Sequence, residues 1–155
     1  MSTLAFMYAS LLAGAVAPTV AHAQGATAGP AMAHVTVQSI HAKNTEEKST
    51  APAALTKVLV RKFKMFKAFH LLGTTEFDLA EGKSGQHMLP DKKTVSVTYL
   101  GRQDEHLKLK LAFPGLKTEM RMKKGKTFYH VGAAYKGGKL IMSVSAKEAA
   151  AAKKK

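Results

Sequence analysis

Residues 106–122 read HLKLKLAFPGLKTEMRM and predict a β-hairpin. From His106 to Phe113 every second residue is large and apolar, and the residues between them are Lys, Lys and Ala. A two-residue period of this kind indicates a strand with one buried face and one solvent face. Pro114-Gly115 is a turn pair, and after it the same period resumes as far as Met122.

The register of this hairpin depends on the turn. If Phe113 lies opposite Leu116, the next pairs on the buried and solvent sides follow from simple counting. L-Pro-Gly favours turns whose twist suits a tight hairpin poorly, so a longer loop is the alternative. The longer loop would also leave the leucines in the core. The tight register predicts the pairs Leu109–Met120 on the buried side and Lys108–Arg121 on the solvent side.

The same period recurs on both sides of this hairpin, with turn residues about every eight to twelve positions. Residues 127–133 and 139–146 predict a second hairpin, whose core face consists of Leu140, Met142 and Val144. Further strands are predicted at residues 34–42, in one or two pieces within 69–80 with a bulge at Gly73, at 86–89 and over 94–99.

Residues 52–65 predict one amphipathic helix. Thr50 is a suitable cap, and Pro52 is tolerated in a first helical turn, where its missing N–H would have no partner. The apolar residues at helical spacing are Leu55, Val58, Leu59, Phe63 and Phe66.

These segments predict a mainly β fold, α+β by strict count: an antiparallel sandwich or partly open barrel of six to eight short strands with one amphipathic helix. The chain of 155 residues suits one domain, which we place at residues 34–146. Residues 147–155, KEAAAAKKK, predict a basic, disordered tail because so short a helix is unstable alone.

The N-terminal segment predicts export. Residues 1–23 contain no Asp, Glu, Lys or Arg and end in Ala21-His22-Ala23, which matches the small-x-small pattern of a signal-peptidase site. Cleavage between Ala23 and Gln24 would leave residues 24–33 as a flexible leader and the protein in the periplasm or outside the cell. The alternative is an uncleaved membrane anchor, although Gly14 and Pro18 interrupt the apolar run. No later segment is long and apolar enough to span a bilayer.

The formal net charge of +14 indicates attraction to polyanions such as nucleic acid, anionic glycans or an anionic envelope surface. The alternative is an ordinary solvated β face with lysines that discourage edge-to-edge aggregation. Tyr129 and Tyr135 could add stacking if the ligand were nucleic acid. The candidate ligand-binding residues, on one solvent face and its adjoining turn, are Lys108, Lys110, Lys117, Arg121, Lys123, Lys124 and Lys126.

No grouping of residues predicts an enzyme, a metal site or a cofactor. The chain has no cysteine, which excludes disulfides and thiolate chemistry, and no nucleophile elbow or phosphate-binding glycine loop. Asp104-Glu105-His106 is the one place where acid and imidazole adjoin, and it falls in a predicted turn. His130 lies among apolar strand residues and is predicted to be a partly buried packing histidine.

The order of segments resembles a group of short exported bacterial proteins to which no activity is assigned. The resemblance rests on FKMFKAFHLL at residues 63–72, Leu89-Pro90-Asp91, Thr127-Phe128 and GKLIMSV at residues 138–144. It covers roughly residues 35–145, implies export and this fold, and implies no site.

The sequence therefore favours a non-enzymatic exported module that binds an anionic polymer or envelope component through a basic β face. A second hypothesis is an accessory subunit of an exported assembly, which docks on protein partners by a sheet edge or an apolar patch. A hydrolase built around His106 is a third.

Overall fold

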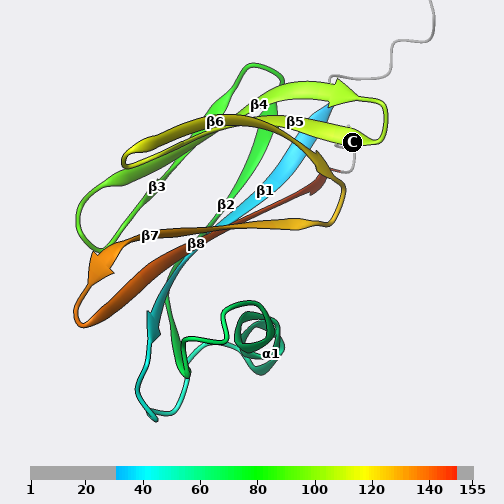
Figure 1. Cartoon of the computed structure of the whole chain (residues 1–155). Coiled ribbons are helices and arrows are strands. Elements are labelled where there is room, and N and C mark those ends of the chain that lie inside the picture. The colour runs from blue at the N-terminus through cyan, green and yellow to red at the C-terminus, as the bar shows by residue number, and fades with distance from the viewer. Residues whose placement is uncertain (1–30, 150–155) are drawn as a thin grey trace, which may run out of the picture.

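The computed structural model describes residues 31–149 as two four-stranded antiparallel sheets and one helix (Figure 1). One sheet has the strand order β2-β1-β8-β7 and the other β3-β4-β5-β6. The predicted sandwich is confirmed, and these eight strands do not close into a barrel. The elements are β1 (Met32–Lys43), α1 (Ala53–Lys62), β2 (Ala68–Ala80), β3 (Ser84–Met88), β4 (Thr94–Gln103), β5 (His106–Phe113), β6 (Leu116–Lys123), β7 (Thr127–Tyr135) and β8 (Gly138–Glu148).

The main core lies between the two sheets. The strands contribute alternate residues to it, as a two-residue period requires, although none of its apolar side chains comes from β3. The predicted leucines of β5 are fully buried there, and the predicted core face of β8 is buried with them. The central residues of this core are Val35, Val37, Val95, Val97, Tyr99, Leu107, Leu109, Leu111, Met142 and Val144.

The tight register of the β5–β6 hairpin is confirmed. Phe113 pairs with Leu116, Leu109 with Met120, and Lys108 with Arg121. The two turn residues accommodate this pairing because Gly115 has a φ of 82°, in the left-handed region that suits glycine, after a proline whose φ is fixed near −65°.

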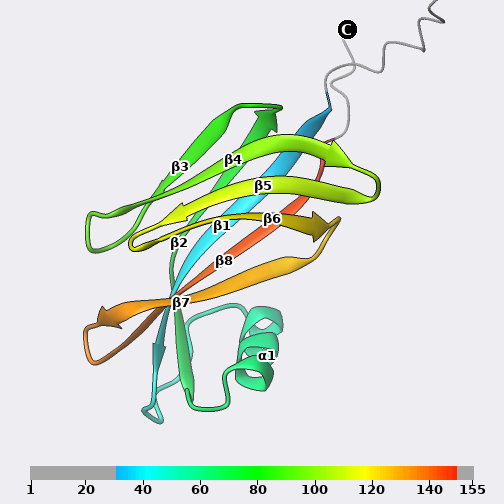
Figure 2. The same cartoon turned by 45° about the horizontal axis from the view of Figure 1, so that its top comes forward.

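The helix α1 covers the outer face of the β2-β1-β8-β7 sheet at one end of the molecule (Figure 2). Ile141 lies between the inward residues of β8 and therefore points outward, where it packs in a second cluster with Ile40 and Leu59. A register shift between Ser39 and Ile40 lies beside Gly73, and the residue left unpaired is Leu72.

Two expectations for this helix are wrong. It ends at Lys62 rather than at residue 65, because Phe63 leaves the helical conformation with φ −121° and ψ 66°. Thr50 does not cap it: the hydroxyl of Thr50 lies 3.2 Å from Nδ1 of His70, and Pro52 precedes the helix without a side-chain cap.

The strands reach slightly beyond the expected domain. β1 begins at Met32, inside the segment predicted as a leader, and β8 continues to Glu148, inside the segment predicted as a tail. The predicted signal peptide, the rest of the leader and residues 150–155 lie outside the described residues. Within residues 31–149 no helix is long and apolar enough to cross a membrane.

Candidate anion-binding surface

The outer face of the β5–β6 hairpin is basic. We call Lys108, Lys110, Lys117, Arg121 and Lys123 the basic face. They alternate with the core residues of the same two strands, so the burial of the leucines and of Met122 directs these side chains to the opposite side. These are five of the seven predicted ligand-binding residues.

The basic face is open to solvent. Lys108 is half-buried among its neighbours and the other four residues are exposed. The helix lies on the other sheet, so α1 does not cover this surface (Figure 2). On the same outer face, Gln86, Ser96 and Thr98 of β3 and β4 are polar and uncharged, and Met88 of β3 is an exposed apolar residue.

One carboxylate interrupts the basic face. Glu119 lies opposite Lys110, and its Oε2 is 3.9 Å from Nζ of Lys108. Five cations and one carboxylate give this surface a formal charge of +4 (+5 − 1). Lys108 faces Arg121 directly, and a like-charged cross-strand pair is destabilising unless an anion lies between its members.

The other two predicted residues, Lys124 and Lys126, lie in the turn between β6 and β7. The turn between β4 and β5 lies at the same end of the sheet. There a hollow of about 340 Å³ is formed at one end of the basic face. The residues that line it are Arg102, Glu105, Lys123, Lys124 and Lys126.

Glu148 holds two cations beside this hollow. Its Oε1 lies 2.8 Å from Nη1 of Arg102, and its Oε2 lies 2.8 Å from Nζ of Lys124. The hydrogen bond from Lys124 lowers the pKa of Glu148, partial desolvation opposes this effect, and the charge of Arg102 adds to it.

Sequence reasoning did not assign Arg102, Glu105 or Glu148 to this surface. Arg102 and Glu105 stand in a polar stretch that reads as an ordinary turn, and Glu148 stands in the Ala/Lys-rich segment predicted as a tail. Contact between them depends on how the two sheets stack. The local sequence pattern does not predict the stacking of the sheets. The only feature in the sequence that could have indicated the contact is Glu148, an isolated acid among the C-terminal lysines.

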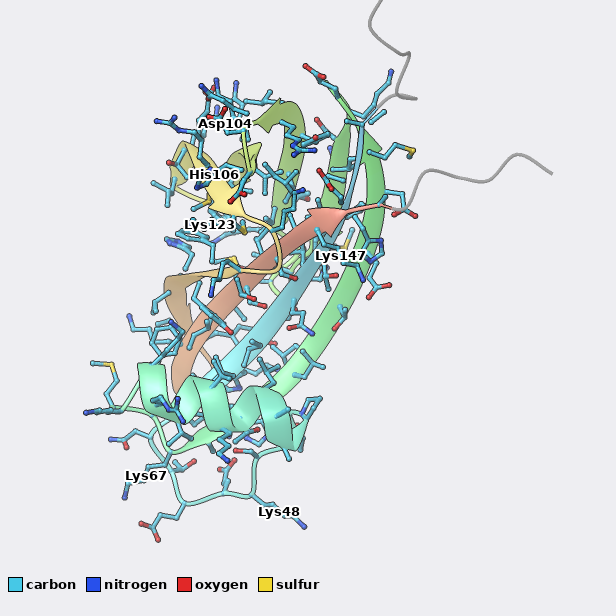
Figure 3. The ribbon with its side chains drawn as sticks, turned by 90° about the vertical axis from the view of Figure 1, so that its right-hand side faces the viewer. Lys48, Lys67, Asp104, His106, Lys123 and Lys147 are labelled. Carbon is cyan, nitrogen blue, oxygen red and sulfur yellow. The ribbon has the colours of Figure 1, made fainter. Side chains whose placement is uncertain are left out.

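The acid–imidazole triplet is not assembled into a pair. Asp104 has a φ of 55° in the β4–β5 turn, and its carbonyl oxygen accepts a hydrogen bond from Nε of Arg102. His106 begins β5 opposite Gln103 and Lys123. Figure 3 shows His106 at the end of the molecule away from α1. Among residues 31–149, no hydrogen bond or ion pair joins His106 to Asp104 or Glu105, and no group of three potential ligands could hold a metal ion.

Tyr129 and Tyr135, which could add stacking to a nucleic-acid ligand, do not lie on the basic face. Both lie on β7, in the other sheet. Tyr129 packs edge-on against Phe63 with ring centroids 5.9 Å apart, and burial raises the pKa of its hydroxyl. Tyr135 packs edge-on against His41 at 5.2 Å.

Two histidines are structural. The ring of His130 is half-buried and stacks on Phe113 at 4.8 Å, which confirms the predicted packing role. His87 is 3% exposed, its Nδ1 lies 2.7 Å from the hydroxyl of Thr75, and its Nε2 has no hydrogen-bond partner among the described residues. Burial lowers the pKa of both rings.

Comparison of the chain with protein-family models, with curated proteins and with solved structures finds no match in any of the three.

Proposed function

We propose that the protein is a non-enzymatic exported module that binds an extended anionic polymer on the basic face. The observation that supports the proposal is the placement of five cations on the solvent side of two paired strands, with one carboxylate among them. The cations alternate with core residues along each strand, so the folded sheet determines the spacing of the charges.

The geometry suits a ligand with repeated charges. Residues on one face of a strand recur about every 6.7 Å, and neighbouring strands lie about 4.8 Å apart. The basic face is thus a small grid of cations, and a polyanion laid across it releases the counterions condensed on several of its charged groups. The hollow beside Lys123 extends the grid at one end, where Lys124 and Arg102 share Glu148.

The expected export signal in residues 1–23 sets the context of the proposal. An exported protein meets anionic glycans and lipopolysaccharide in the envelope, and nucleic acid outside the cell. All three ligands present repeated anionic groups, so the basic face can be tested against each of them.

The test measures binding of the purified chain to fluorescent duplex DNA, heparin and lipopolysaccharide over a series of salt concentrations. The face variant combines Lys108→Gln, Lys110→Gln, Lys117→Gln and Arg121→Gln. The control variant removes the same number of charges at the other end of the molecule by Lys57→Gln, Arg61→Gln, Lys64→Gln and Lys67→Gln. For DNA, the log–log salt slope of the face variant should fall by about 3 to 4 units, since each neutralised phosphate contributes about 0.9.

The control variant should keep the slope of the unaltered chain, and the polymer bound most tightly near physiological salt names the ligand class. Equal losses in the two variants would show that only net charge matters. If all three polymers bind solely at low salt and without preference, the proposal is abandoned. An accessory subunit with protein partners would then be the hypothesis to pursue.

A further inference from the structure

A second basic surface lies at the opposite end of the molecule and has a different composition. We call α1 together with residues 63–67 the helix end. Residues 50–75 contain no aspartate or glutamate. The cations of the helix end, all exposed, are Lys57, Arg61, Lys62, Lys64 and Lys67.

Large apolar side chains are exposed among these cations. Val58 is 42% exposed, Val60 44% and Met65 69%. The helix has already used other residues for packing, because Leu59 is fully buried and Phe66 is 9% exposed in the cluster under α1. Val58, Val60 and Met65 are therefore surplus to the core, and they make up half of the six large hydrophobic residues that the described chain exposes.

The helix end is free to meet a broad surface. α1 lies outside the sandwich at one end (Figure 1). Lys48 and Lys67 lie at this end, whereas His106 and Lys123 lie at the other (Figure 3). A flat partner could touch the helix end without contacting the basic face.

Local acids neutralise little of this charge. Glu46 lies 2.9 Å from Nζ of Lys67, and Glu47 pairs with Lys43 rather than with a cation of the helix. Lys62 lies over the ring of Tyr129, 5.5 Å from its centroid, and no ion pair within residues 31–149 includes it. The surface thus combines an excess of positive charge with exposed apolar side chains.

We propose that the helix end docks on an anionic lipid bilayer, with its Lys and Arg side chains at the headgroups and Met65, the most exposed apolar side chain of the helix end, at the boundary with the acyl chains. Interfacial helices bind by this combination of apolar burial and attraction to anionic lipid. A soluble polyanion would gain from the cations alone, whereas a bilayer also removes the apolar side chains from water. The mixed composition therefore favours lipid at the helix end.

A single tryptophan can report on this docking, because the chain contains none. Met65→Trp places the reporter at the helix end. Met88→Trp is the matched control, since Met88 is an equally exposed methionine, at 72%, on β3 in the other sheet. Each protein is mixed with vesicles of phosphatidylcholine alone, and with vesicles containing phosphatidylcholine and phosphatidylglycerol in equal parts.

The fluorescence of Met65→Trp should shift to the blue with the anionic vesicles and should not shift with phosphatidylcholine, while Met88→Trp should shift with neither. Adding Lys57→Gln, Arg61→Gln, Lys64→Gln and Lys67→Gln to Met65→Trp should weaken vesicle binding by at least a hundredfold, because each basic residue near an anionic surface contributes about a fivefold factor. A membrane interaction of residues 1–23 alone would not shift Met65→Trp.

The proposal is overturned if the two reporters respond alike, if Met65→Trp shifts equally with neutral vesicles, or if it shifts with neither. The substitutions in the basic face leave this readout unchanged, so failure of membrane docking and failure of polymer binding give different results. A blue shift of Met65→Trp on adding heparin, without vesicles, would assign the helix end to a polymer instead.

Discussion

Lys108 and Arg121 lie directly opposite each other across the β5–β6 ladder, both on the solvent side. Two cations in such a pair repel, and the nearest carboxylate, on Glu119, is 3.9 Å from Nζ of Lys108. The pair therefore opposes folding of the free protein and becomes favourable when an anion lies over it.

Arg121→Glu should stabilise the free protein while it weakens polymer binding. The change replaces a repulsive cross-strand pair by an attractive one, which contributes about 0.2–1 kcal/mol, a rise of a few degrees in the melting temperature. Lys117→Glu is the matched control, since it reverses the same charge opposite the uncharged Ala112. Thermal unfolding should separate the two variants, and salt-dependent binding should weaken in both. An equal melting temperature in the two would contradict a specific effect of the pair.

Leu111→Ala should destabilise the sandwich by about 2–5 kcal/mol, because it opens a cavity beside fully buried neighbours. Leu72→Ala is the control. Leu72 is 40% exposed at the β1–β2 irregularity, and its truncation should change stability little. Urea denaturation followed by circular dichroism gives both free energies of unfolding. A loss below about 1 kcal/mol at Leu111 would mean that the inter-sheet core repacks around the missing side chain.

The same leucines explain why the sequence predicts much of this fold. Alternation in β5 assigns each residue to a face, and the tight register, one of the two that the Pro-Gly pair leaves open, predicts the pair Lys108–Arg121 that the structure has. Once the hairpin is correct, five of the predicted basic residues must share a surface.

Features that depend on tertiary contacts were not predictable in this way. Thr50 has the side chain of a helix cap, yet His70, twenty residues later, holds its hydroxyl. Tyr129 has the composition of a stacking residue, yet it packs under α1 because β7 pairs with β8 in the other sheet. Glu148 joins the hollow only because β8 continues past the expected end of the domain, and an Ala/Lys-rich segment carries no strand signal.

Glu148→Gln should strengthen anion binding at the end of the basic face. The change removes the carboxylate that pairs with Arg102 and Lys124, so both cations become available to a polymer. The log–log salt slope for DNA should become steeper by about 1 to 2 units. Glu76→Gln, on β2 and away from the sheet that carries the basic face, removes the same charge and should leave the slope unchanged. A shallower slope in Glu148→Gln would show that the two cations need their carboxylate partner for correct placement.

The pH dependence of stability should report the burial of His87. Burial lowers the pKa of its ring below 6.5 in the folded protein, so the unfolded chain binds the proton more readily. The contribution of neutral His87 is fully present above pH 6.5 and is lost as the pH falls towards the folded pKa, by at most about 1.4 kcal/mol per pH unit.

His87→Gln keeps a polar group near the hydroxyl of Thr75 but cannot titrate. It should therefore be less stable than the unaltered protein at pH 7.5, and the difference should narrow by pH 5. His106→Gln, at the solvent-side start of β5, serves as the control for a general histidine effect. Free energies of unfolding from urea titrations at several pH values give the comparison. A difference that stays constant between pH 7.5 and 5 would mean that His87 takes up its proton equally well in the folded and unfolded chains.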